Sequence, residues 1–336
     1  MDISMDEAIA KFPDFLVEAK TISQSISPNI TDIDKIFVLG MGGSALGGDL
    51  LSVILEKISP VPVHVIRNDA IPAFLDRRSL IFAVSYSGNT QETLTAVQQA
   101  ETRAPGKIIA ISTGGTLKEW AQKKSLPFVE IPGGLMPRAA LPYTFVPLLF
   151  LSQKVLKFDD PSSAFEEMVH VLRSMHDLTV AHQIAQSLKN KVTVIYGAHP
   201  SLAPAAKRWK CQINENAKQP AYGLSFPEVA HNEIVGYTYK LEVHQSISTI
   251  ILVDENEDAP TKARVEFAKK AMQNSGCIVH EVVSQGKSFL AKLLSLCYAG
   301  DHVSLALAKA LQIDPVPIEI IDRLKKEMKH VAVPSA

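Results

Sequence analysis

Cysteine is scarce in this chain of 336 residues. Its three cysteines, Cys211, Cys277 and Cys297, lie far apart and form neither a CxxC pair nor a disulfide framework. Disulfide-stabilised secreted domains and the common cysteine-based zinc sites are therefore not indicated. We expect a reduced protein that works in the cytoplasm.

The chain also lacks an excess of charge and any long apolar run. Its 34 basic and 35 acidic residues nearly cancel, so we expect no nucleic acid or other polyanion as partner. No apolar run is long enough to cross a membrane, and we expect no membrane attachment. The acidic, mixed segment from Met1 to Lys11 is unlike a signal peptide. Hydrophobic residues make up 46%, which is ample for buried cores.

Short apolar runs alternate with helical patterns in both halves of the chain, with a purely helical stretch over 142–190 between them. Such alternation is typical of parallel sheets covered by helices, and it predicts an α/β fold. We expect a first domain over 1–152 with a leading helix, a helical connection over 153–190, and a similar second domain over 191–336 with a closing helix. The expected strands are 36–39, 61–66, 81–84, 107–112, 128–132, 192–197, 248–253 and 277–282.

The stretch from Ile81 to Thr93 carries the clearest functional pattern. A buried strand ends at three hydroxyl side chains, Ser85, Ser87 and Thr90, which precede a helix. Backbone N–H groups at a helix N-terminus and nearby hydroxyls form a favourable anion site. Because the loop contains no lysine, a phosphate monoester suits it better than a magnesium-bound triphosphate. The alternative is an ordinary strand-to-helix turn with a Ser or Thr cap.

Two further loops contain small or cationic residues that suit a ligand. The glycine-rich loop over 40–48 departs from the dinucleotide fingerprint at Ala45 and has no P-loop lysine, but Gly43 and Ser44 would let a ligand approach the backbone. The stiff loop over 132–138 ends in Arg138, which could stabilise an oxyanion. Their alternatives are a tight turn and a surface arginine that caps the next helix.

The segment over 214–233 is the richest in polar groups. Glu215 and Glu233 are candidate bases and His231 a candidate acid, although isolated Glu and His residues are more often solvated or structural. His170, His176 and His182 recur every six residues, which places them on different faces of a helix. We therefore assign no metal and no cofactor.

Five motifs, in order along nearly the whole chain, resemble the bifunctional phosphoglucose/phosphomannose isomerase family of the wider sugar isomerase (SIS) group. They are "GMGGSALGGDL", "SYSGNTQET", "PGGLMPRAALPY", "NENAK" and "EVAHNEIVGY". The resemblance implies two SIS domains and reversible conversion of glucose 6-phosphate or mannose 6-phosphate to fructose 6-phosphate.

The resemblance also implies a role for individual residues. Arg138 would steady the developing oxyanion, Glu215 would move the proton between C1 and C2, and His231 would open the sugar ring. The phosphate and sugar would be held by five small residues: Gly43, Ser44, Ser85, Ser87 and Thr90.

The match near the C-terminus is looser. "GDHVSLALAK" is similar to the "DQWGVELGK" stretch of conventional phosphoglucose isomerases, which would make Lys309 a second ring-opening group. His302 would then tolerate the mannose epimer, whereas an alignment shifted by two residues nominates Ser304.

The resemblance further implies a homodimer in which His231 is donated across the interface. Pro220, Gly223 and Pro227 predict an extended excursion between Glu215 and His231 that leaves its own domain. Two other functions stay open: another sugar-phosphate or amino-sugar-phosphate isomerase, and a sugar-phosphate sensor built on the same fold.

Overall fold

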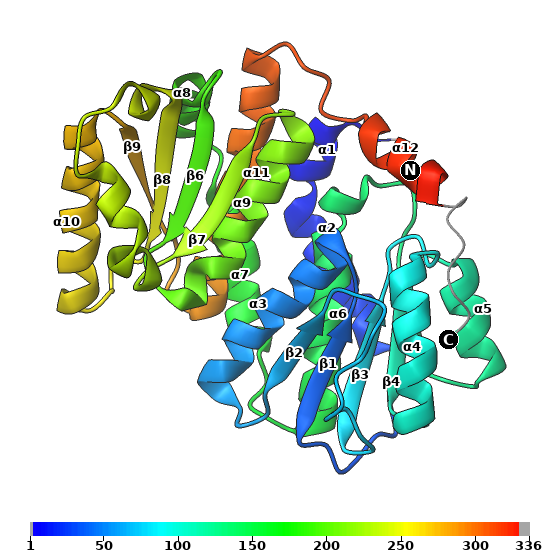
Figure 1. Ribbon diagram of the computed structural model, residues 1–336. Helices are drawn as coiled ribbons and strands as arrows, with labels where there is room; N and C mark the ends of the chain where they lie inside the picture. The colour runs from blue at the N-terminus through cyan, green and yellow to red at the C-terminus, as the bar shows by residue number, and fades with distance from the viewer. Residues whose placement is uncertain (1–2, 329–336) are drawn as a thin grey trace.

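Continuous apolar segments of the first half form a five-stranded parallel sheet (Figure 1). All residues of the central strands β3 and β4 are buried, as expected for parallel strands covered on both faces. The sheet order is β2-β1-β3-β4-β5, with β1 (Lys35–Leu39), β2 (Val63–Ile66), β3 (Ser79–Val84), β4 (Ile108–Ser112) and β5 (Phe128–Glu130).

The second half forms a smaller parallel sheet of four strands. The computed structural model describes residues 3–328. The order of the second sheet is β7-β6-β8-β9, with β6 (Val192–Gly197), β7 (Ala221–Ser225), β8 (Ile247–Val253) and β9 (Ile278–Val283).

Helices flank both sheets and connect them. None of the helices within 3–328 is both long and apolar enough to span a membrane. The α-helices are α1 (Met5–Ala10), α2 (Phe12–Gln24), α3 (Gly42–Ile58), α4 (Gln91–Arg103), α5 (Gly115–Lys123), α6 (Leu141–Leu156), α7 (Ser162–Ser174), α8 (Thr179–Leu188), α9 (Ala203–Asn216), α10 (Ala259–Ser275), α11 (Phe289–Ala310) and α12 (Glu319–Met328).

The α/β fold with two helix-flanked parallel sheets is therefore confirmed, and each expected strand lies within a few residues of an observed one. The domain boundaries stay a prediction, and residues 1–2 and 329–336 of the predicted domains lie outside the described residues.

The expected excursion between Glu215 and His231 is wrong in its first part. Residues Ala221–Ser225 form the edge strand β7, which pairs with β6 of the same domain. The two prolines flank this strand instead of breaking it. Gly223 lies against α9, where an added Cβ would come within 2.9 Å of the Ala206 carbonyl oxygen. Close packing of strand and helix, and not a turn, explains this glycine.

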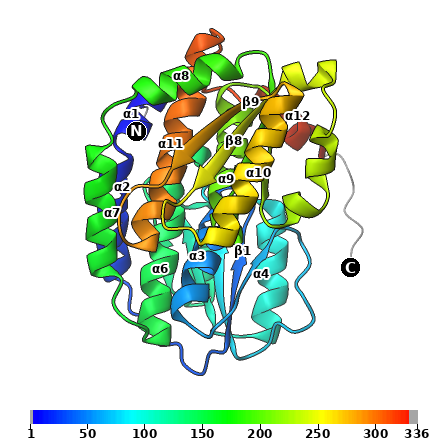
Figure 2. The same ribbon diagram turned by 90° about the vertical axis from the view of Figure 1, so that its left-hand side faces the viewer.

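One hydrophobic cluster joins the two sheets and extends from α1 and α2 through α6 to α9 and α11. A second cluster packs α4 and α5 against the other face of the first sheet. Figure 2 shows α7 alongside α2, and α7 also packs on α11, so the helical connection contacts both domains.

A buried ion pair lies where the domains meet. Arg208 of α9 and Asp301 of α11 are 2% and 1% exposed, and their side chains form two hydrogen bonds of 2.9 and 2.8 Å. Arg208 also donates to the Arg138 carbonyl at 2.7 Å, and Gln212 donates to the Asp301 carboxylate at 2.8 Å. All donor nitrogens of this guanidinium therefore have a partner.

Loss of Arg208 should destabilise the protein strongly, because Asp301 would stay buried without its cation. We expect Arg208→Met to lower the free energy of unfolding by about 3–5 kcal/mol in urea melts. Lys325→Met removes a cation from an exposed pair with Asp322 and should change it by less than about 1 kcal/mol. Equal small effects of the two substitutions would contradict the role assigned to the buried pair.

Candidate active site

The hydroxyl-rich loop over 85–90 lies at the carboxyl end of β3. The Ser85 and Thr90 hydroxyls share a 2.9 Å hydrogen bond across the loop. Thr90 precedes α4, yet within the described residues no side chain caps this helix. The loop is therefore not the ordinary capped turn, and the first N–H groups of α4 suit an anionic ligand.

Two loop residues without a hydroxyl group fix its shape. Gly88 has a φ of +71°, and an added Cβ would come within 1.9 Å of the Gly114 carbonyl oxygen. The Asn89 amide oxygen accepts hydrogen bonds of 3.0 Å from the backbone and hydroxyl of Thr116. The loop over 85–90, here called the anion loop, is thus held against the turn after β4 and the start of α5.

Gly43 and Ser44, at the start of α3, link this loop to Arg138. The Ser44 hydroxyl accepts a 3.3 Å hydrogen bond from the Tyr86 backbone N–H. A Cβ on Gly43 would come within 3.3 Å of the Pro137 carbonyl oxygen, so the helix start packs directly on the turn that carries Arg138. The predicted sugar-contacting pair therefore lies between the anion loop and the guanidinium.

Arg138 belongs to the short 3-10 helix η1 (Pro137–Ala139) and is only 3% exposed. Its Nε donates to the Asn216 amide oxygen at 2.7 Å, and its Nη2 donates to the carbonyls of Pro315 and Val316. Burial lowers the pKa of this guanidinium, and the nearby Glu215 carboxylate opposes that shift. Arg138 therefore does not cap a helix at the surface. It is a buried cation whose side chain is held by Asn216 and by two backbone carbonyls.

Glu215 lies in the last turn of α9 and faces Arg138. Its carboxylate oxygen is 3.6 Å from Arg138 Nη1, and its side chain is 31% exposed. A carboxylate beside a fixed cation, with one side open to solvent, can accept a proton while the cation stabilises the charge that forms.

Comparison with known proteins assigns the chain to a family. Residues 29–126 match the SIS domain model, and residues 178–328 match the bacterial phospho-glucose isomerase C-terminal SIS domain. A bifunctional phosphoglucose/phosphomannose isomerase of Caldicellulosiruptor bescii is 39% identical, over 97% of this chain and 99% of that protein. One of Aquifex aeolicus is 34% identical, over 92% and 95%. The chain belongs to the bifunctional phosphoglucose/phosphomannose isomerase family.

A solved structure outside this family shares the fold. The C-terminal domain of glucosamine-fructose-6-phosphate aminotransferase from Francisella tularensis superposes with a TM-score of 0.74 at 14% identity, over 92% of this chain and 97% of that one. At this identity the likeness concerns the fold alone.

His231, which the family motif assigns to ring opening, ends the short 3-10 helix η3 (Glu228–His231) and is exposed. In the described part of this single chain it is not among the polar partners of Arg138 or Glu215. Glu233, the other candidate base, accepts a 3.0 Å hydrogen bond from the Tyr196 hydroxyl. This holds the half-buried Glu233 against β6 of its own domain, and within the described residues its polar partner is Tyr196 and not Arg138.

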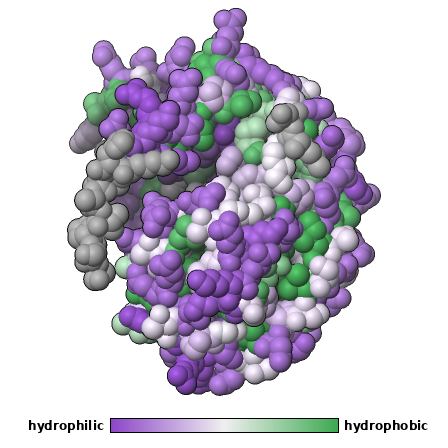
Figure 3. Space-filling view, turned by 90° about the vertical axis from the view of Figure 1, so that its right-hand side faces the viewer, coloured by the Kyte–Doolittle hydropathy of each residue, from purple (hydrophilic) through white to green (hydrophobic). Residues whose placement is uncertain are grey.

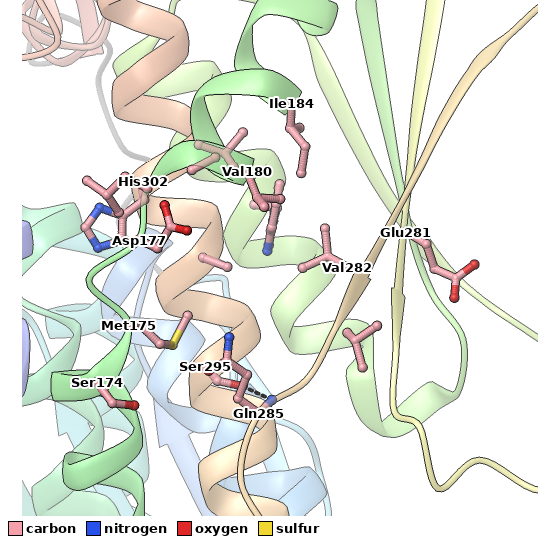
Figure 4. A pocket seen from close by; sticks show the side chains of 16 residues that line it. Ser174, Met175, Asp177, Val180, Ile184, Glu281, Val282, Gln285, Ser295 and His302 are labelled. Carbon is pink, nitrogen blue, oxygen red and sulfur yellow. Dashed lines mark hydrogen bonds between the residues drawn. The ribbon is translucent and has the colours of Figure 1, made fainter.

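The two remaining residues taken from the family pattern, Lys309 and His302, lie on another side of α11. Lys309 forms an ion pair with Asp6 of α1. His302 lines a cavity of about 370 Å³ with Ser174 and Asp177 (Figure 4). Burial lowers the pKa of this histidine. Within one chain, the structure does not bring either residue to Glu215.

Ser304, nominated by the shifted alignment, connects to the site. Its hydroxyl accepts a 2.9 Å hydrogen bond from Asn216 Nδ2, and Asn216 in turn accepts from Arg138. Residues 302 and 304 face opposite sides of the helix because two residues correspond to about 200°. Asn216 itself could not be singled out from the sequence.

The face of the molecule on which α12 lies has a hollow between the first and the second domain (Figure 3). The space-filling view shows this face as mainly hydrophilic, which suits a polar ligand better than an apolar one. Within 3–328 no group of three or more His, Cys, Asp or Glu residues could hold a metal ion.

The anion loop should bind phosphate through Ser87 and Thr90. We expect Ser87→Ala/Thr90→Ala to raise KM for hexose phosphates, since each hydrogen bond to a charged group contributes about 1.5–3 kcal/mol. Isothermal titration with fructose 6-phosphate measures the loss directly. Thr102→Ala, which removes an exposed hydroxyl of α4, is a control. Unchanged binding by the double variant would show that the loop is only a turn.

Proposed function

We propose that the protein interconverts glucose 6-phosphate and mannose 6-phosphate with fructose 6-phosphate through a cis-enediolate. The observation that carries the proposal is the 3.6 Å pair of Glu215 and Arg138, which is linked through Gly43 and Ser44 to the anion loop. Membership of the family supports the same reaction.

Glu215 is the proposed base. It removes the C2 proton of the open-chain aldose, the C2 electron pair forms the C1–C2 double bond, and the negative charge develops on O1. The same carboxyl group then returns the proton to C1 as the O2 hydroxyl proton passes to O1, so that C2 becomes the carbonyl carbon of the ketose. No net oxidation occurs, and the scheme needs neither a redox cofactor nor a metal.

Arg138 is the proposed stabiliser of the enediolate. Its Nε and Nη2 are bound by protein groups, so Nη1 is the donor directed toward Glu215. A preorganised cation in a buried setting needs little rearrangement when charge forms, which lowers the barrier. The phosphate in the anion loop supplies binding energy that orients the reacting end.

Ring opening and acceptance of mannose are assigned from the family pattern. We propose His231 for ring opening, with Lys309 as a second group that must first leave Asp6. Because C2 becomes planar in the enediolate, the two aldose epimers share one intermediate. Ser304, through Asn216 and Arg138, is better placed than His302 to affect how both epimers fit.

An assay with mannose 6-phosphate distinguishes this function from the two alternative functions. An amino-sugar-phosphate isomerase would leave mannose 6-phosphate unchanged, and a sensor would bind hexose phosphates without turnover. Formation of fructose 6-phosphate from mannose 6-phosphate by the purified protein would therefore decide among the three.

We also propose a homodimer with composite active sites that works in the cytoplasm. The edge strand β7 and the segment from η4 (Glu233–Tyr237) to η5 (Glu242–Ser246) expose large apolar side chains beside the helix that carries His231. An apolar surface around a polar site residue suits a partner subunit. The exposed residues are Tyr222, Leu224, Val235, Tyr239, Leu241 and Val243.

Glu215→Gln should keep the shape of the site but abolish proton transfer. We expect kcat to fall by at least about 100-fold, with little change in KM. Exchange of the C2 hydrogen with solvent deuterium should stop as well. Glu233→Gln is the matched control and should retain most activity, because Tyr196 already binds that carboxylate. Wild-type exchange in Glu215→Gln would assign the base elsewhere.

Mixing two inactive variants tests the shared site. If each site takes Glu215 from one chain and His231 from the other, a Glu215→Gln/His231→Ala mixed dimer has one intact site. Co-refolding equal amounts should recover up to about a quarter of wild-type activity, since about half of the dimers are mixed. Mixed dimers purified with two different tags and found inactive would refute the sharing.

A further inference from the structure

Lys218 has a backbone conformation that is unfavourable for lysine. It follows Ala217, the C-cap of α9, and has a φ of +55°. Glycine is the usual residue at this position because it has no side chain to strain the left-handed conformation. A lysine at this position makes the fold less stable than a glycine would. Backbone strain of this kind tends to occur at functional sites, where the side chain has a role.

The ammonium of Lys218 bridges two parts of the site. It donates to the Glu215 carbonyl at 2.5 Å and to the Pro315 carbonyl at 3.1 Å. Pro315 belongs to residues 311–318, here called the C-terminal strap, which connects α11 to α12 (Figure 1). Lys218 therefore joins the strap to the turn of α9 that carries the proposed base.

The Pro315 carbonyl also accepts from Arg138 Nη2, so Lys218 and Arg138 share one acceptor. The Val316 carbonyl accepts a second bond from the same nitrogen at 3.1 Å. With Nε on Asn216, the strap determines that Nη1 is the nitrogen turned toward Glu215. A displaced strap would free Nη2 and let the guanidinium rotate.

The charges around this junction are balanced. Asp314 in the strap attracts both Arg138 and Lys218, while the two cations repel each other. Partial burial and the neighbouring Arg138 lower the pKa of the Lys218 ammonium, even though the residue lies at the surface. Two cations and two carboxylates thus meet where the strap crosses the end of α9.

We propose that Lys218 is a positioning residue for the isomerisation. It binds the C-terminal strap to α9 and so keeps the Arg138 guanidinium oriented toward the Glu215 carboxylate. The inference rests on the proposed function, because it assigns these two side chains to the reaction. It differs from a plain helix-capping role, which would require only the bond to the Glu215 carbonyl.

Lys218→Gly separates the two roles. Glycine relieves the backbone strain, so the melting temperature should stay the same or rise. The strap loses its tie, and kcat should fall about 10- to 100-fold through misplacement of Arg138. KM should change little, because the anion loop is untouched. A crystal structure of the variant should show the Arg138 bond to Pro315 broken.

Two further variants serve as controls. Lys218→Arg keeps the charge and the N–H donors and should lose clearly less activity than Lys218→Gly. Lys210→Gln removes a cation from the same helix away from the strap and should keep wild-type kcat.

Each outcome has a distinct meaning. Wild-type kcat in Lys218→Gly, or a loss of kcat that only follows a loss of stability, overturns the positioning role while the proposed function stands. Wild-type protein without isomerase activity overturns both.

Discussion

The buried pair of Arg208 and Asp301 is the interaction on which the site depends. Two charges removed from water stabilise a fold only if their hydrogen-bonding groups are satisfied. Here the guanidinium is bound on every nitrogen, twice by the carboxylate and once by the backbone carbonyl of Arg138. One ion pair thereby joins α9, α11 and the short helix η1.

The support for the site extends outward from that pair. Arg208 fixes the backbone of Arg138, and Asn216 fixes its side chain while Ser304 holds Asn216. On the other side, Gly43 packs against the turn of Arg138, and Ser44 binds the anion loop. Rigid support of this kind keeps a catalytic geometry within the narrow tolerance that proton transfer requires.

The sequence predicted best those features whose residues lie close together along the chain. Alternating apolar runs predicted the two sheets, and the hydroxyls of the anion loop lie within six residues, so both could be recognised without tertiary contacts. Strand β7 was missed because the tight packing of Gly223 on α9 resembles a turn in the sequence. His302 and Ser304 could not be separated from the sequence, since only packing decides which side of α11 faces α9. Asn216 binds Arg138 across the domain boundary, and Lys218 binds a carbonyl 97 residues further along the chain, so neither partner could be predicted. The individual roles of the site residues stay predictions.

The bond between Arg138 and the strap also affects how the protein matures. Arg138 and Pro315 are 177 residues apart in the sequence, and nascent domains fold in order from the N-terminus. The first sheet can form on the ribosome while its arginine still lacks most of its acceptors. The proposed active centre is therefore complete only when almost the whole polypeptide has emerged, so a chain that ends before Pro315 lacks the carbonyls that orient Arg138.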